Sequence, residues 1–182
     1  MPITNPNPID HLLAVANSYH EPEARDVGSG DSAHWIPAHD HLDSAETATE
    51  FLTRMGVRAP GQPGRQQLAR LRQVRSTARS LLSRPSTYTR ELGDLLAHTR
   101  YRLDPKGELQ PVGEDWDGLI AGLLVSLVEL RDQAPRLKVC ANDQCRWLFL
   151  DHSKNRSRQW CGAATCGNRS RVRRFRSRQE AK

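Results

Sequence analysis

Apolar residues recur at steps of three and four positions in several stretches of the first 132 residues, with polar residues between them. This spacing places the apolar side chains on one face of a helix. Asp43 and Glu46 have the spacing of a capping box, and Gly56 follows the last apolar position, so both ends of one such helix are marked. The pattern predicts helices over residues 11–19, 43–55, 68–81, 85–96 and 115–132.

Turn signals separate these helices. Residues 20–40 mix Gly, Pro, His and acidic residues without periodicity, which predicts a loop. Residues 57–64 are a turn-rich connector. Residues 101–112 alternate apolar and polar positions around the turn sequence Asp-Pro-Lys-Gly, in which proline presets φ and glycine accepts a positive φ. We therefore expect a small β-hairpin before the last of these helices.

The helix predicted over residues 115–132 is apolar around most of its circumference, so we expect it at the centre of a helical domain. Its apolar run, residues 119–130, is shorter than the roughly 20 residues that cross a bilayer. Pro135 ends the helix and marks a boundary. The chain is thus expected to be mainly α, with a multihelical domain carrying a small β-hairpin over residues 1–136 and a second, small unit over residues 137–182.

Charge distinguishes these two parts of the chain. Residues 138–182 contain 12 of the 27 Lys and Arg residues but only 3 of the 21 Asp and Glu residues. Their formal balance is +9, whereas the other residues balance at −3. A strongly basic end on a mildly acidic body indicates a module that binds a polyanion.

The four cysteines of the chain all lie in this basic part. Four residues separate Cys140 from Cys145, fifteen separate Cys145 from Cys161, and four separate Cys161 from Cys166. Two short-spaced pairs around a hairpin-sized insert are typical of a Cys₄ zinc site, because each pair can direct two sulfurs at one point. The insert has strand-prone residues 147–150 and Trp160 on either side of a polar turn. We expect one structural Zn²⁺, since four thiolates leave no position for water or substrate.

Other uses of the cysteines are open. The chain shows no apolar N-terminal stretch that would serve as a signal peptide, so we expect a reducing, cytoplasmic setting in which clustered cysteines more often bind metal than form disulfides. Two disulfides and an iron–sulfur cluster are the alternatives. A module of about 45 residues gains much of its folding free energy from the metal, so loss of one thiolate should unfold it.

At these residues the chain resembles the CGNR zinc-finger family, whose name is the tetrapeptide that stands here at residues 166–169. The resemblance covers residues 137–178 and includes residues 147–151, Trp160 and Cys161. It implies a treble-clef-like finger, a hairpin followed by a helix. In that family the finger closes a chain whose N-terminal part is a helical ABATE domain, and the proteins are regarded as stress-related transcription regulators of bacteria. Residues 1–136 are similar to that domain in length and helix order.

The segment after Cys166 predicts a basic helix. Val172 and Phe175 lie three positions apart and are expected to pack onto the hairpin, while arginines occupy much of the remaining surface. Such a density of like charge is unfavourable unless a polyanion neutralises it, and phosphate suits the arginine fork. The expected nucleic-acid contacts are Lys154, Asn155, Arg156, Arg158, Arg169, Arg171, Arg173, Arg174, Arg176 and Arg178.

Some of these residues have a second interpretation. Asn155 and Asn168 can read a base edge, but Asn168 at a helix start can equally cap backbone groups. Arg146 or Arg169 can neutralise the formal charge of −2 that four thiolates and one zinc carry. A solvated tail, an RNA partner or an acidic protein surface are further alternatives for the basic helix.

These observations lead to one expected function and one competitor. We expect a zinc-dependent DNA-binding transcription regulator whose helical domain senses a small-molecule effector or forms a homodimer. Residues 20–41, with Trp35 and Trp116, are the expected effector region. No Gly-rich phosphate loop, nucleophile elbow or HExxH motif occurs, so an enzyme is not expected. The alternative is a small-molecule-binding protein or enzyme whose finger is a structural or docking module.

Overall fold

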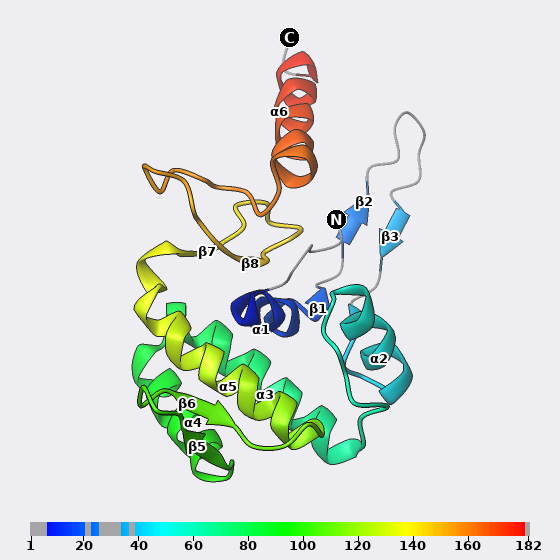
Figure 1. Ribbon diagram of the computed structural model, residues 1–182. Coiled ribbons are helices and arrows are strands. Elements are labelled where there is room, and N and C mark those ends of the chain that lie inside the picture. The colour runs from blue at the N-terminus through cyan, green and yellow to red at the C-terminus, as the bar shows by residue number, and fades with distance from the viewer. Residues whose placement is uncertain (1–6, 21–22, 26–33, 37–38, 181–182) are drawn as a thin grey trace. The chain divides into compact units, whose positions relative to one another are not determined.

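The structure is a computed structural model that describes residues 7–20, 23–25, 34–36 and 39–180 (Figure 1). The chain forms two compact units, residues 1–19 with 40–135 and residues 20–39 with 136–182. Below, the helical unit means the described part of residues 7–19 and 40–135, and the finger means residues 136–180. The expected domain boundary after residue 136 stays a prediction. No helix in the described part is both long and apolar enough to cross a membrane.

The helical unit is built around one central helix, and the expected mainly α fold is confirmed. Helix α5 contacts α1, α3 and α4, as Figure 1 shows, and buries Leu123, Leu124 and Leu127 almost completely. The hydroxyl of buried Tyr88 on α4 donates to the Leu127 carbonyl at 2.6 Å, which satisfies the one polar atom that this packing buries on Tyr88. The helices of this unit are α1 (Pro8–Ala16), α2 (Ala45–Arg54), α3 (Arg65–Ser83), α4 (Pro85–Ala97) and α5 (Trp116–Asp132).

The first helix begins earlier than predicted. Asn7 caps α1 by accepting the Ile9 N–H, and Pro8 occupies the first turn, where its missing N–H has no consequence. The prediction of residues 11–19 was wrong at both ends, since the helix runs from Pro8 to Ala16. The three prolines among the first ten residues had indicated irregular structure, although Asn7 and Pro8 are typical of a helix start.

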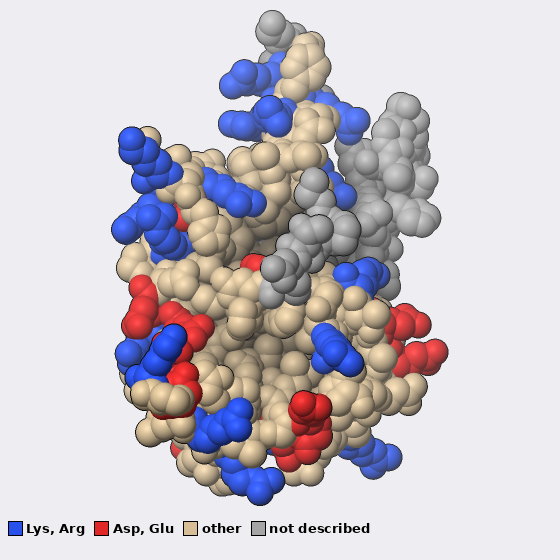
Figure 2. Space-filling model, viewed as in Figure 1, with Lys and Arg blue, Asp and Glu red and all other residues tan. Residues whose placement is uncertain are grey.

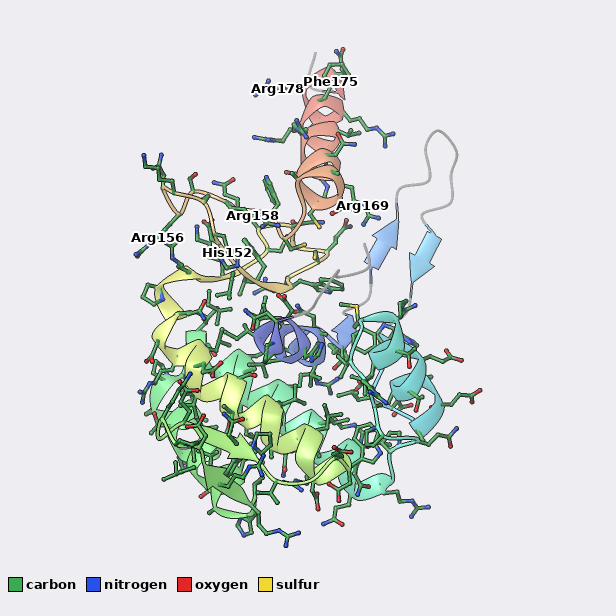
Figure 3. All side chains as sticks on the ribbon, viewed as in Figure 1. His152, Arg156, Arg158, Arg169, Phe175 and Arg178 are labelled. Atoms are coloured by element: carbon green, nitrogen blue, oxygen red, sulfur yellow. The ribbon has the colours of Figure 1, made fainter. Side chains whose placement is uncertain are left out.

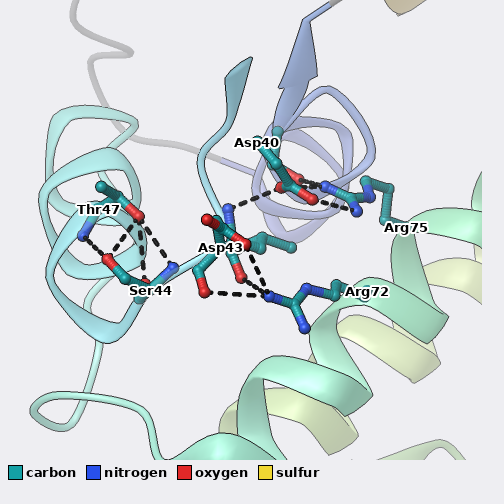
Figure 4. Close-up of polar contacts among 8 residues, drawn as sticks. Asp40, Asp43, Ser44, Thr47, Arg72 and Arg75 are labelled. Atoms are coloured by element: carbon teal, nitrogen blue, oxygen red, sulfur yellow. Dashed lines mark hydrogen bonds and ion pairs between the residues drawn. The ribbon is translucent and has the colours of Figure 1, made fainter. Parts of the chain in front are cut away.

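The capping box of α2 lies one residue after the predicted pair. Ser44 is the N-cap, and its hydroxyl accepts the Thr47 N–H while the Thr47 hydroxyl accepts the Ser44 N–H (Figure 4). Asp43 is instead held to α3, since Arg72 donates to the carbonyls of Leu42 and Asp43. The prediction of Asp43 with Glu46 was therefore wrong in register, although the helix itself is present.

Short antiparallel strands accompany the helices. The predicted hairpin is confirmed as β5 (Tyr101–Leu103) paired with β6 (Leu109–Pro111). Residues 20–40 are not wholly a loop as predicted, because their described part includes strands. These are β1 (Tyr19–His20) paired with β4 (His39–Asp40), and β2 (Glu23–Arg25) paired with β3 (His34–Ile36). Trp35 of the expected effector region lies in β3 and Trp116 begins α5, whereas residues 21–22, 26–33 and 37–38 lie outside the described residues.

The finger contains one hairpin, one π-helical turn and one α-helix. Strand β7 (Leu137–Val139) pairs with β8 (Leu148–Leu150), and the π-helical turn Ala163–Gly167 leads into α6 (Asn168–Glu180). The strand-prone residues of the insert between Cys145 and Cys161 form β8, within the predicted range 147–150. The hairpin spans the first cysteine pair, because β7 ends before Cys140 and β8 begins after Cys145.

Candidate metal centre and basic helix

The four cysteines converge on one point of the finger. Their sulfurs all lie within 4.8 Å of one another, and no other such group of His, Cys, Asp and Glu occurs among the described residues. The Sγ atoms of Cys145 and Cys161 are 3.6 Å apart, as are those of Cys161 and Cys166. Four sulfurs bonded to one Zn²⁺ at roughly 2.3 Å in a tetrahedron lie about 3.8 Å apart. The separations therefore suit a single zinc ion and exceed a disulfide bond.

The hairpin turn presents the first two sulfurs. The Asn142 carbonyl accepts the N–H groups of Cys145 and Arg146 at 2.8 and 3.0 Å, and the Trp147 carbonyl accepts the Cys140 N–H at 2.8 Å. Arg146 takes a positive φ of 49°, which closes the turn. These bonds fold residues 140–147 into a knuckle with both thiols on one side. The four-residue gap between Cys140 and Cys145 therefore forms the tight turn that its length predicts.

The second knuckle carries the other two sulfurs at the start of α6. The Gly162 carbonyl accepts the Gly167 N–H at 3.0 Å, which closes the π-helical turn that contains Cys166. Gly167 is buried, and a Cβ at this position would lie 3.1 Å from Cδ1 of Trp160. A methyl group there would press on the indole ring, which would have to shift by a few tenths of an ångström, so the close approach favours glycine at this position of the tetrapeptide.

Apolar side chains and polar hydrogens surround the sulfurs. Phe149 and Trp160 pack against the four cysteines. The Cys161 N–H points at Sγ of Cys140 at 3.5 Å, and the Asn142 amide points at Sγ of Cys166 at 3.7 Å. Such contacts favour thiolates and orient them. Cys140 and Cys166 are buried, whereas Cys145 and Cys161 are partly exposed.

The thiols affect one another's ionisation. The side-chain hydrogen bond from Cys161 lowers the pKa of Cys145 to about 6, whereas the bond to Cys145 and burial raise the pKa of Cys161. Burial likewise raises the pKa of Cys166. Among the thiols alone, one thiolate therefore opposes the next. A divalent cation removes that conflict, so the donor set fits Zn²⁺ by its chemistry as well as its geometry.

A buried carboxylate, Asp151, organises the turn between the two knuckles, a role that the sequence patterns above did not predict. Asp151 accepts from the Lys138 ammonium at 2.6 Å, from the Arg158 N–H at 2.9 Å and from both the N–H and the hydroxyl of Ser153. Burial by itself raises the pKa of Asp151, but the Lys138 and Ser153 contacts outweigh it and hold this pKa well below its usual range. Its spacing from Ser153 is the local signal that was available, since an Asp often bonds two residues on.

Two of the arginines expected to contact nucleic acid bind the finger itself. Arg158 donates to the carbonyls of Trp160 and Cys161 and lies over the Phe149 ring. Arg173 donates to Gln144 Oε1 at 2.6 Å and to Asn142 Oδ1 at 3.3 Å, which attaches α6 to the first knuckle. Both remain exposed at their surfaces, so the structure gives them a structural contact in addition to the predicted one.

The other expected contact residues lie at the surface of the finger. Lys154, Asn155 and Arg156 are exposed in the turn after Asp151, and all six arginines of α6 are exposed. Figure 2 shows Lys and Arg side chains gathered over α6 and this turn, and Figure 3 labels Arg156 on the turn and Arg169 and Arg178 on the helix. Asn168 is exposed at the first position of α6, so both of its interpretations stay predictions.

The expected packing of α6 was wrong. Val172 and Phe175 do not bury themselves against the hairpin, because their exposed fractions are 42% and 64%. Arg173 occupies the side of α6 that meets the first knuckle. The apolar pair is therefore left facing solvent.

Comparison with known proteins identifies the finger. Residues 136–179 match the family model of the CGNR zinc finger, and this stretch contains the four clustered cysteines. The finger is thus a zinc-binding module of that type. No curated protein matches the chain. The likeness of residues 1–136 to the ABATE domain stays a prediction.

Proposed function

We propose that the chain is a zinc-dependent DNA-binding transcription regulator in which the finger contacts DNA and the helical unit senses a small molecule or forms a homodimer. The observation that carries this proposal is the exposure of six arginines on α6, directly after the metal-binding Cys166. A zinc ion held by both knuckles orders the start of this helix. The arginines then lie on an ordered helix, where each planar guanidinium can bind a phosphate group through two hydrogen bonds.

The local electrostatics support a polyanion as the partner. Like charges three and four positions apart destabilise an isolated helix, and α6 carries such pairs along its length. Phosphates remove this repulsion and release counterions, which adds affinity. An acidic protein surface does not present negative charges at regular intervals, as a nucleic-acid backbone does. Whether the partner is DNA or RNA is decided by the binding experiment below.

The test is the salt dependence of binding by the full-length, zinc-loaded protein. Duplex DNA selected from a random pool should bind with an affinity that falls steeply as salt rises. The slope of log affinity against log salt should flatten by about three to four when four phosphate contacts are removed. The test variant replaces Arg171, Arg174, Arg176 and Arg178 by alanine, and the matched control replaces four exposed arginines of the helical unit, Arg58, Arg65, Arg90 and Arg102.

The control variant loses the same net charge, so it separates a local effect from a general one. Binding to DNA that is equal in the two variants would refute the assignment of α6. Absence of any duplex binding by the parent protein, with tight binding to RNA or to an acidic protein, would refute DNA as the partner.

A cavity in the helical unit favours an effector. About 570 Å³ of space lies between α3 and α4, and charged side chains line it, including Arg70, Glu91, Asp94 and His98. This lining suits a polar molecule that offers both donors and acceptors. Native mass spectrometry of the purified protein should show a mass beyond chain and zinc, and Leu95→Trp, which places a larger side chain in the cavity, should lower the occupancy of that mass. If the Leu95→Trp variant carried the additional mass in full, the effector would not bind in this cavity.

A further inference from the structure

Phe175 is the exception among the phenylalanines of this chain. The sequence contains three, and Phe51 and Phe149 are buried with exposed fractions of 2% and 7%. Phe175 is 64% exposed, and Val172, three positions earlier, is 42% exposed. An aromatic and an aliphatic side chain therefore share one surface of a helix that is otherwise polar and basic. Figure 3 labels Phe175 toward the end of α6, beside Arg178.

The contact of Arg173 with the first knuckle sets which way Phe175 points. Arg173 bonds to Asn142 and Gln144, so its side of α6 faces the knuckle. Each residue of an α-helix turns by about 100°, so Phe175 lies about 160° from Arg173 around the axis. Phe175 therefore projects away from the body of the finger. Gln179, four positions after Phe175, lies on the same outward face and is exposed.

Arginines flank this apolar face on both sides. At about 100° a residue, Arg171 and Arg178 fall on one side of Phe175, and Arg169 and Arg176 fall on the other. An apolar strip between two rows of cations complements a groove that has an apolar element in its floor and phosphates along both rims. The helix has 13 residues and so a length of about 20 Å, and the major groove of B-DNA, about 12 Å wide, admits a helix. The minor groove, about 6 Å wide, does not.

We propose that α6 lies in the major groove of duplex DNA with Phe175 and Val172 against the 5-methyl group of thymine. This inference rests on the function proposed above and specifies how the same surface reads sequence. The thymine methyl is the apolar group that the four bases present in the major groove. The flanking arginines hold the two phosphate backbones, and the Gln179 amide is placed to bond adenine next to the contacted thymine. The finger therefore prefers sites that contain thymine at the contacted position.

Replacing thymine by uracil tests the contact directly, because it removes the methyl group and leaves base pairing unchanged. The full-length, zinc-loaded protein is titrated with the duplex that random selection yields, and with duplexes in which each thymine in turn is replaced by uracil. At the contacted position the affinity should fall about fourfold, the factor that burial of one methyl group provides. Replacements at other positions should leave the affinity unchanged.

The variant Phe175→Ala makes the test specific to this side chain. Phe175 is exposed and on a helix, so alanine should leave zinc content and helicity as they are. Its affinity for the thymine duplex should fall toward that of the uracil duplex, and its thymine-to-uracil ratio should fall to the part that Val172 retains. Phe175→Leu, which keeps an apolar contact, should retain part of the ratio.

Several results would overturn the inference. A selected site without thymine, or a thymine-to-uracil ratio of one at every position in the parent protein, would remove the methyl contact while the salt-dependent binding of the proposed function remained. Tighter binding to an RNA hairpin than to duplex DNA would do the same, because the major groove of A-form RNA is too narrow for the helix. Failure of the parent protein to bind any nucleic acid would remove the proposed function as well.

Discussion

Arg173 and Asn142 are joined by a hydrogen bond of 3.3 Å between Nη2 and Oδ1, and the other end of the Asn142 amide points at Sγ of Cys166, 3.7 Å away. One amide thus bridges a metal-binding sulfur and the basic helix. The Asn142 side chain therefore contributes both to the position of α6 and to the orientation of the second knuckle. We expect changes at Arg173 to reach the metal site, and changes at its neighbours to stay local.

Adjacent arginines of α6 should differ in their effect on the finger. Arg173→Ala removes the bonds to Asn142 and Gln144, whereas Arg174→Ala removes the same charge and none of these bonds. Because the Arg173 contacts are largely exposed, the loss should be about 1 kcal/mol or less. Hydrogen exchange of residues 168–180 should be faster in Arg173→Ala than in Arg174→Ala. Equal exchange in both variants would show that Arg173 does not hold the helix.

Asp151→Asn should weaken the whole finger. The carboxylate accepts hydrogen bonds from Lys138, Ser153 and Arg158. Asparagine has an NH₂ group in place of one carboxylate oxygen, so a donor would then face these donors. Because Asp151 is buried, water cannot take the place of the lost acceptor, and the donors are left without a partner. Zinc affinity measured by chelator competition should fall about tenfold or more. The matched control is Asp143→Asn, which makes the same charge change at a side chain whose 3.4 Å ion pair with Arg173 is exposed and therefore weak, and its zinc affinity should stay within about threefold.

Two glycines of α5 should respond to alanine with opposite sign. A Cβ at Gly118 would lie 2.0 Å from the Gly113 carbonyl oxygen, so the turn before α5 would have to move. A Cβ at Gly122 meets nothing closer than Pro111 Cγ at 4.0 Å. Urea unfolding should show Gly118→Ala less stable by about 1–3 kcal/mol. Gly122→Ala should be more stable by up to about 1 kcal/mol, since alanine favours a helix. Stabilisation by both changes would contradict the close approach at Gly118.

The ion pair of Asp40 and Arg75 should stabilise the helical unit only above acidic pH. Burial opposes ionisation of Asp40, but two bonds from Arg75 at 2.6 and 2.9 Å and the Leu42 N–H lower its pKa below the ordinary 3.8 (Figure 4). A lowered folded pKa gives stability that is present above pH 3.8 and is lost as the pH falls further.

Asp40→Asn removes this titration, which makes it the test. Helical circular dichroism during urea unfolding should give a difference between parent and Asp40→Asn that is constant from about pH 7 to pH 5 and shrinks below the ordinary pKa of 3.8. Arg75→Gln should behave in the same way. A difference that grows as the pH falls would contradict the sign of the shift.

Patterns with a local cause could be read from the sequence. Cysteine spacing identified Cys140, Cys145, Cys161 and Cys166, because each knuckle is a turn built within a few residues. Periodicity predicted helices over residues 68–81 and 115–132, and the structure has them over 65–83 and 116–132, because an apolar face at helical spacing is visible in the local sequence.

Features decided by distant contacts could not be read in this way. Ser44 rather than Asp43 caps α2, because Arg72 and Arg75 of α3 hold the segment before it. The partner of β8 is β7, on the other side of the first knuckle, and no pattern within residues 147–150 predicts this pairing. The spacing of Val172 and Phe175 places them on one face of α6, but it does not show whether another part of the chain covers that face. Arg173 lies on the side of α6 that contacts the first knuckle, so Val172 and Phe175 stay exposed.

Every role proposed for the finger requires a single zinc ion held by four sulfurs, and X-ray absorption at the zinc edge measures this directly. The full-length protein, purified without added metal, should contain one zinc per chain, surrounded by four sulfurs at about 2.3 Å. Cys166→Ser should lose this shell together with the helical signal of α6. A metal content far below one, or a shell with nitrogen or oxygen ligands in the parent protein, would contradict the account.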